Sequence, residues 1–118
     1  MKLLLVDDST VMRRMMKNQL GQLGVTDTVE ASNGQEALEV LASNMPVDII
    51  LLDWNMPVMD GMTFLKTVRA DNTYKDVKIV MCTSESEKSK VIVAMKEGVN
   101  NYIVKPFTPE ALQEKLGL

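Results

Sequence analysis

The sequence predicts an α/β fold in which helices cover both faces of an open, parallel β-sheet. Two observations carry this prediction. Short aliphatic runs alternate along the chain with longer segments of helical periodicity. The chemically distinctive polar residues follow these runs at their carboxyl ends and form no comparable set at the other ends. Five runs and five helical segments predict a doubly wound, five-stranded sheet with five helices.

The predicted strands are short and aliphatic, as is typical of parallel strands that are buried on both faces. The pattern is weakest in the second of them, at residues 29–31. The predicted strands are residues 3–6, 29–31, 49–52, 77–82 and 102–104.

The predicted helices have start and stop signals. Ser9 is a suitable N-cap for the first helix, and Gly24 stands where that helix should end. Gly98 ends the fourth helix, and Thr108 caps the fifth, with Pro109 at its first helical position. The predicted helices are residues 10–23, 35–41, 62–69, 87–96 and 109–116.

Composition excludes several classes of function. The 118 residues suffice for one hydrophobic core, so we expect a single domain over residues 1–118. A net charge of −3 argues against nucleic acid and against an anionic membrane surface as partners. The absence of histidine excludes imidazole catalysis and His-ligated metals. The single cysteine, Cys82, cannot form an intramolecular disulfide and is expected to be a small buried hydrophobe.

The two ends of the chain carry their own expectations. The N-terminal apolar run is too short for a signal peptide, and no segment reaches membrane-spanning length. We therefore expect a cytoplasmic protein that does not associate with membranes. The last helix ends about two turns after it begins, which fits either a trimmed C-terminus or excision from a longer chain.

Polar residues converge on the carboxyl edge of the predicted sheet, where open α/β folds bind ligands. Asp7 and Asp8 follow the first strand, and Asp53 closes the third. Thr83 follows the fourth strand and Lys105 the fifth. The convergence predicts a binding or catalytic site at this edge.

The three carboxylates at this edge predict a metal site. Helix capping explains a single acid, and Asp8 alone would suit that role. Three converging acids repel one another, and a bound cation relieves the repulsion. Because the ligands are oxygens without His or Cys, we predict that Asp7, Asp8 and Asp53 hold a hard cation, Mg²⁺.

Asp53 is the candidate nucleophile, because carboxylates form aspartyl phosphates in several enzyme classes. The turn-rich stretch DWNMPVMDG at 53–61 should expose this carboxylate and leave Trp54 partly exposed. Lys105 could neutralise the acids at rest and bind an incoming phosphoryl oxygen, to which Thr83 would add a hydroxyl donor. Beside Mg²⁺, these groups suit in-line attack on phosphorus.

These residues, in this order, resemble the receiver domain of two-component response regulators. The signature comprises Val6-Asp7-Asp8-Ser9, the stretch 53–61, Thr83 and Lys105-Pro106-Phe107, and the resemblance covers the whole chain. Within this family the chain is most similar to single-domain chemotaxis regulators, in DDSTVMRRMMKNQL (7–20), DWNMPVMDG (53–61) and NNYIVKPFTPEALQEKL (100–116). The resemblance implies a flavodoxin-like fold with strand order 2-1-3-4-5.

The resemblance implies a role for each acid. Asp53 would accept a phosphoryl group from a chemotaxis histidine kinase. Asp8, Asp53 and the backbone carbonyl of Asn55 would ligate Mg²⁺, and Asp7 would act through water. Asn55, Glu85 and the small Ser84 would tune the lifetime of the phosphate. A partner phosphatase is left open, and we expect a monomer.

The resemblance also implies how the signal leaves the site. Lys105 and Thr83 would bind phosphoryl oxygens, Tyr102 would turn inward as Thr83 moves, and Lys105-Pro106 would be a cis peptide. An output surface on the fourth helix, fifth strand and fifth helix would bind a flagellar motor switch protein. Its expected residues are Lys88, Val91, Met95, Tyr102 and Lys115.

Two of these surface residues, and two arginines, also have plainer interpretations. Val91 and Met95 lie four residues apart and share a helix face, so both could belong to the core, Met95 more readily than Val91. Arg13 and Arg14 are expected to form a solvated face, although kinase docking near the first helix stays open.

Three other functions fit parts of the pattern. A phosphatase similar to haloacid dehalogenases needs an acid two residues after its nucleophile, where Asn55 stands and can protonate nothing. A flavin-binding module needs a phosphate loop that Asp7 and Asp8 would repel. A receiver domain excised from a longer regulator with a separate output domain stays open. We expect a signalling switch that is not an enzyme, beyond slow self-catalysed phosphorylation and dephosphorylation.

Overall fold

The structure, a computed structural model, describes residues 1–118, apart from the side chain of Glu85. It confirms the predicted α/β fold, with five parallel strands in the order β2-β1-β3-β4-β5. The elements in chain order are β1 (Lys2–Val6), α1 (Thr10–Gln22), β2 (Asp27–Ala31), α2 (Gly34–Asn44), β3 (Ile49–Asp53), α3 (Gly61–Arg69), η1 (Asn72–Tyr74), β4 (Lys78–Thr83), η2 (Glu85–Glu87), α4 (Ser89–Lys96), β5 (Asn101–Val104) and α5 (Pro109–Leu116).

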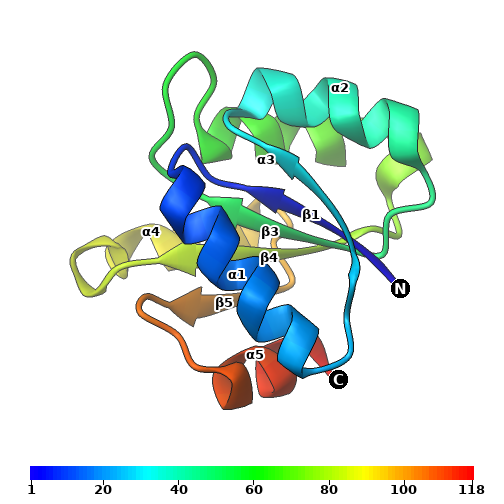
Figure 1. The fold of residues 1–118 in the computed structure, drawn as a ribbon. Helices are drawn as coiled ribbons and strands as arrows, with labels where there is room; N and C mark the ends of the chain where they lie inside the picture. Colours follow the sequence, from blue (N-terminus) through cyan, green and yellow to red (C-terminus); the bar gives the residue numbers. More distant parts are fainter.

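Helices cover both faces of the sheet (Figure 1). The side chains of each strand alternate between two buried clusters, so that Leu4 and Val6 face one layer while Leu3 and Leu5 face the other. The first layer is completed by α2, α3 and α4, and the second by α1 and α5. Within the described part of the chain, no helix combines the length and apolarity that crossing a membrane requires.

The ends of the predicted elements are correct to within two residues except at the end of α2, and the larger differences have physical causes. β2 begins at Asp27, because its ladder with β1 already pairs Lys2 with Asp27. α2 continues to Asn44, whose side-chain amide donates to the carbonyl of Val40 at 2.7 Å. α4 begins at Ser89, because residues 85–87 form a separate 3-10 turn.

The predicted N-caps of the first and last helices and the glycine after α4 are confirmed. The Ser9 hydroxyl accepts the backbone N–H of Met12 at 3.2 Å, and Thr108 accepts that of Ala111 at 3.2 Å. Gly98 follows α4 with φ of 105°, a backbone conformation that favours glycine. These contacts explain why α1 and α5 begin where the sequence predicts.

Arg69, at the end of α3, joins that helix to the segments that lead into β4 and β5. Its guanidinium donates to the carbonyls of Gly98 at 2.9 Å, Tyr74 at 3.2 Å and Val77 at 2.8 Å. It also donates to the Asn100 side chain at 2.9 Å. One side chain therefore ties the end of α3 to the two loops that lead into β4 and β5, at the amino edge of the sheet.

We expect Arg69→Met to lower the free energy of unfolding by about 2 kcal/mol, because it leaves several carbonyls without their charged donor. Urea denaturation measures this. The matched control is Lys66→Met, an exposed position on the same helix, which should change the free energy of unfolding little. Equal effects of the two substitutions would contradict the bridging role of Arg69.

Candidate functional site

Three polar or charged residues are buried among those described: Asp7, Asp53 and Thr83, which are 1%, 6% and 0% exposed. Each stands at the carboxyl end of a strand, directly after β1 or as the last residue of β3 or β4. Buried polar groups are uncommon enough to be informative. Cys82 beside them is inert, because burial raises the pKa of its thiol to about 12.

Asp7, Asp8 and Asp53 lie together at this edge, and one carboxylate oxygen from each falls within 4.8 Å of the other two. Asp7 and Asp53 are buried, whereas Asp8 is exposed, so the cluster faces solvent on the Asp8 side. The donors are all carboxylate oxygens, which suit a hard divalent cation. This acidic group could therefore hold a metal ion.

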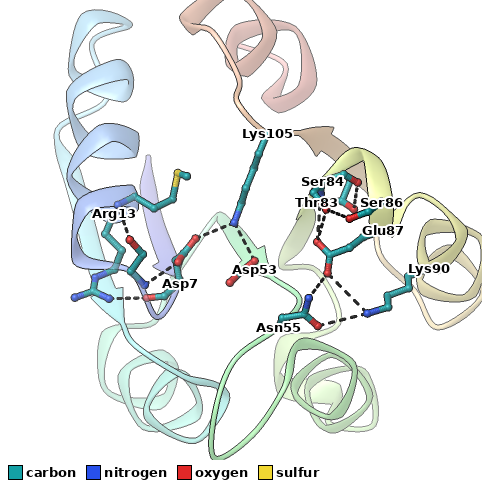
Figure 2. Close-up of polar contacts among 12 residues, drawn as sticks. Asp7, Arg13, Asp53, Asn55, Thr83, Ser84, Ser86, Glu87, Lys90 and Lys105 are labelled. Atoms are coloured by element: carbon teal, nitrogen blue, oxygen red, sulfur yellow. Dashed lines mark hydrogen bonds and ion pairs between the residues drawn. The ribbon is translucent and has the colours of Figure 1, made fainter.

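Lys105 lies between two of these acids (Figure 2). Its ammonium nitrogen is 3.1 Å from Asp7 Oδ2 and 2.9 Å from Asp53 Oδ1. The backbone N–H of Lys105 donates to the Thr83 carbonyl at 2.7 Å, which ties the β5 end to the β4 end. The peptide between Lys105 and Pro106 is cis, as the resemblance implied. At rest, this lysine neutralises part of the acidic cluster.

Burial and charge shift the pKa values of both partners in the ion pair of Asp53 with Lys105. Burial raises the pKa of the Asp53 carboxyl, and the hydrogen bond and charge of Lys105 offset this only in part. Burial alone would lower the pKa of Lys105, but its contacts with Asp53 and Asp7 outweigh burial and raise the pKa. Lys105 is therefore held in its charged form, while ionisation of Asp53 is disfavoured.

Thr83 and Tyr102 lie on the same face of the sheet, since Tyr102 pairs with Met81, two residues before Thr83. The Thr83 hydroxyl donates to the carbonyl of Ser84 at 3.1 Å and is therefore already engaged. Tyr102 is half-buried, and the Lys115 ammonium lies 4.8 Å from the centre of its ring, a cation–π contact. These contacts connect the end of β4 to β5 and α5.

A polar cluster on the α4 side of the site joins the expected Asn55 and Ser84 to Glu87 and Lys90, two residues that the sequence analysis did not single out (Figure 2). The Asn55 amide donates to the Glu87 carboxylate, and Lys90 lies 3.4 Å from the Asn55 oxygen. Glu87 also accepts the N–H and hydroxyl of Ser84 at 3.3 and 3.0 Å. The capping-box spacing from Ser84 to Glu87 was the available signal. The side chain of Glu85, the other expected tuning residue, lies outside the described residues.

The prediction that Trp54 is partly exposed is wrong, since its side chain is 5% exposed and belongs to the core. The loop after β3 folds back so closely that Gly61 touches it. A Cβ on Gly61 would lie 2.7 Å from the Asp53 carbonyl oxygen and 2.8 Å from the Trp54 ring. The lack of a side chain at Gly61 therefore allows α3 to begin directly against the residue that carries the central carboxylate.

The prediction that Arg13 lies on a solvated face is also wrong, whereas Arg14 is exposed as expected. The Arg13 side chain is 15% exposed, and its guanidinium donates to the Asp7 carbonyl at 2.5 Å and to Glu30 at 3.0 Å. β2 supplies the acid that draws this arginine inward. A pairing across 17 positions of sequence leaves no local signal.

The residues of the expected output surface differ in exposure. Met95 is 49% exposed, which excludes the alternative that it belongs to the core. Val91 is half-buried and packs against the core, because it lies on the helix face of the buried Ala94, one turn away. Lys88 is exposed at the start of α4. Of the three α4 residues expected on the output surface, Met95 and Lys88 are therefore the exposed ones.

Comparisons with known proteins agree with this geometry. The model of the response regulator receiver domain matches residues 3–117. Chemotaxis protein CheY1 of Helicobacter pylori strain J99 is 55% identical over 116 residues, 98% of this chain and 94% of the relative. Chemotaxis protein CheY of Pseudomonas aeruginosa is 47% identical over 116 residues, 98% of this chain and 93% of the relative. Among solved structures, Vibrio cholerae CheY4 has a TM-score of 0.88 and 38% identity, covering 98% of this chain and 95% of that one.

We expect Asp53→Asn to raise the free energy of unfolding at pH 7 without divalent metal. The raised pKa of Asp53 means that the folded state binds its proton more tightly than the unfolded chain, so ionisation above the folded pKa opposes folding. The stabilisation should shrink as the pH falls toward the ordinary pKa of Asp, about 3.9. The matched control for urea denaturation is the exposed Asp76→Asn. An Asp53→Asn variant less stable than wild type at pH 7 would contradict this assignment.

Proposed function

This chain belongs to the family of response regulator receiver domains, and we propose that it is a phosphorylation-activated switch in chemotaxis signalling. The observation that carries the proposal is a buried Asp53 grouped with Asp7, Asp8 and Lys105 at the edge of the sheet. The full-length match to relatives named as chemotaxis proteins supports the pathway. The expected cytoplasmic location and monomeric state stay predictions.

Asp53 is proposed as the phosphoacceptor, with a phosphohistidine of a kinase as the donor. A carboxylate oxygen of Asp53 forms a bond to phosphorus while the bond from phosphorus to the imidazole nitrogen breaks. The imidazole leaves with that electron pair. Lys105 lies 2.9 Å from an Asp53 oxygen, so its charge is already placed to bind an oxygen of the transferred group.

The acidic cluster is proposed as a Mg²⁺ site, since its donor set consists of carboxylates that lie close together. Asp8, Asp53 and the backbone carbonyl of Asn55 would hold the ion, and Asp7 would act through water. When bound, Mg²⁺ supplies positive charge that offsets the charge of the phosphoryl oxygens. Asp7 meanwhile retains Lys105 at 3.1 Å, which keeps the lysine at the site.

Thr83 and Tyr102 are proposed as the switch. A phosphoryl group adds about 1.5 to 2 negative charges, and its oxygens compete with the Ser84 carbonyl for the Thr83 hydroxyl. Tyr102 lies on the same face of the sheet and turns inward as Thr83 moves. Because the phosphoryl group is bound better in this arrangement, phosphorylation shifts an equilibrium between two conformations. The Asn55–Glu87–Ser84 contacts tune how fast water reaches the phosphate.

The proposed output is the binding of a flagellar motor switch protein by α4, β5 and α5. Tyr102 and Lys115 are in contact, so an inward turn of the ring also frees the Lys115 ammonium. The exposed Met95 and Lys88 extend this surface along α4. Val91 is half-buried and packs against the core, so it would couple the position of α4 to the core.

The acceptor site is tested by Trp54 fluorescence during titration with Mg²⁺ and then with beryllofluoride, which stands in for the phosphoryl group. Trp54 is buried directly after Asp53, so its emission should respond to both ligands. We expect a saturable Mg²⁺ response and a further beryllofluoride change that Asp53→Asn abolishes and Asp76→Asn preserves. A folded wild-type protein that responds to neither ligand would overturn the proposal.

Met95→Glu should weaken binding of the flagellar motor switch protein by about tenfold in the beryllofluoride-treated state, because a charge replaces an exposed apolar contact. The Trp54 response to beryllofluoride should not change. Met45→Glu is the control, at an exposed methionine that precedes β3 at the opposite edge of the sheet. Equal binding by the Met95 and Met45 variants would place the output surface elsewhere.

A further inference from the structure

Arg13, on the first turns of α1, lies beside Asp7 at the acidic edge (Figure 2). Its Nη1 donates to the carbonyl oxygen of Asp7 at 2.5 Å, and its Nε donates to Glu30 Oε1 at 3.0 Å. Its Nη2 lies 3.4 Å from the Thr10 hydroxyl. The planar guanidinium therefore bridges the end of β1 and the neighbouring strand β2, a task that needs donors pointing in several fixed directions.

The carbonyl that Arg13 binds belongs to the peptide between Asp7 and Asp8. The N–H of Asp7 donates to Ala31 at 3.1 Å, and its carboxylate accepts the N–H of Ser9 at 2.8 Å. With Arg13 on the carbonyl, Asp7 is held on each side of its backbone and at its side chain. The same peptide joins Asp7 to Asp8. The orientation of this peptide therefore also sets the direction of the exposed Asp8.

Glu30 in turn holds Arg13. Its carboxylate accepts from Arg13 at 3.0 Å and from Lys17 at 3.2 Å. Burial alone would raise the pKa of Glu30, but the hydrogen bonds and charges of Lys17 and Arg13 outweigh burial and lower it. Glu30 is therefore ionised at neutral pH, and its charge anchors the arginine.

We propose that Arg13, anchored by Glu30, is a positioning residue that orients Asp7 and Asp8 for divalent metal binding. The inference rests on the proposed function, because it takes these two acids as metal ligands. As a charge alone, Arg13 opposes the binding of a cation a few residues away. As a fixed hydrogen-bond donor, it favours binding by holding the ligand-bearing backbone. The two roles predict opposite effects when the side chain is replaced.

The test measures the dissociation constant of Mg²⁺, from Trp54 fluorescence and from calorimetry, in wild type and in Arg13→Met, Arg13→Lys and Arg14→Met. We expect Arg13→Met to weaken Mg²⁺ binding about tenfold or more, the range typical of residues that orient metal ligands. Arg13→Lys keeps the charge but loses the planar guanidinium with its several donors, so it should weaken Mg²⁺ binding as well. Arg14→Met removes an exposed charge from the same helix and should leave binding unchanged or slightly tighter.

The outcomes separate the two proposals. Arg13 variants that bind Mg²⁺ as tightly as Arg14→Met, or more tightly, would overturn the positioning role, including the case in which only their stability to urea falls. If Arg13→Met does not fold, the result for Arg13→Lys decides. A folded wild-type protein that binds no Mg²⁺ would instead overturn the proposed function, a result distinct from failure of the Arg13 inference.

Discussion

The Lys105 ammonium lies 3.1 Å from Asp7 and 2.9 Å from Asp53, and the acidic edge of the sheet depends on this ion pair. Parallel strands deliver their carboxyl ends to one edge, so strand-end acids are brought together whether or not they repel. Lys105 offsets part of that repulsion and leaves ionisation of Asp53 disfavoured by burial. An acidic cluster that one lysine neutralises only in part gains from added positive charge, which a bound divalent cation would supply.

The same edge is connected to the surface by short contacts through β4 and β5. The backbone N–H of Lys105 donates to the Thr83 carbonyl. The Thr83 hydroxyl donates to the Ser84 carbonyl rather than to the acids. Tyr102 shares the sheet face of Thr83 and touches Lys115 on α5. The end of β4, the edge strand β5 and the surface of α5 are therefore neighbours within one short segment of the structure.

The fold was predictable because its signals are local: buried aliphatic strands, Ser9 and Thr108 caps, and polar residues at strand ends. The acidic cluster followed from topology, since parallel strands end at one edge. Contacts between distant segments were missed. From the sequence, Arg13 is expected at the surface, because its contacts with Glu30 and the Asp7 carbonyl form only in the fold. The burial of Trp54 likewise depends on the close approach that Gly61 permits. Such pairings carry no periodicity that a single sequence can display.

The position of the phosphoryl group on the chain decides whether Asp53 is the phosphoacceptor. The folded protein is incubated with Mg²⁺ and acetyl phosphate, then reduced with borohydride, which converts an acyl phosphate on aspartate to homoserine, and mapped by peptide mass. We expect one modified residue, Asp53, with no modification at the adjacent Asp7 or Asp8. Modification at another residue, or none in a folded sample that binds Mg²⁺, would contradict this expectation.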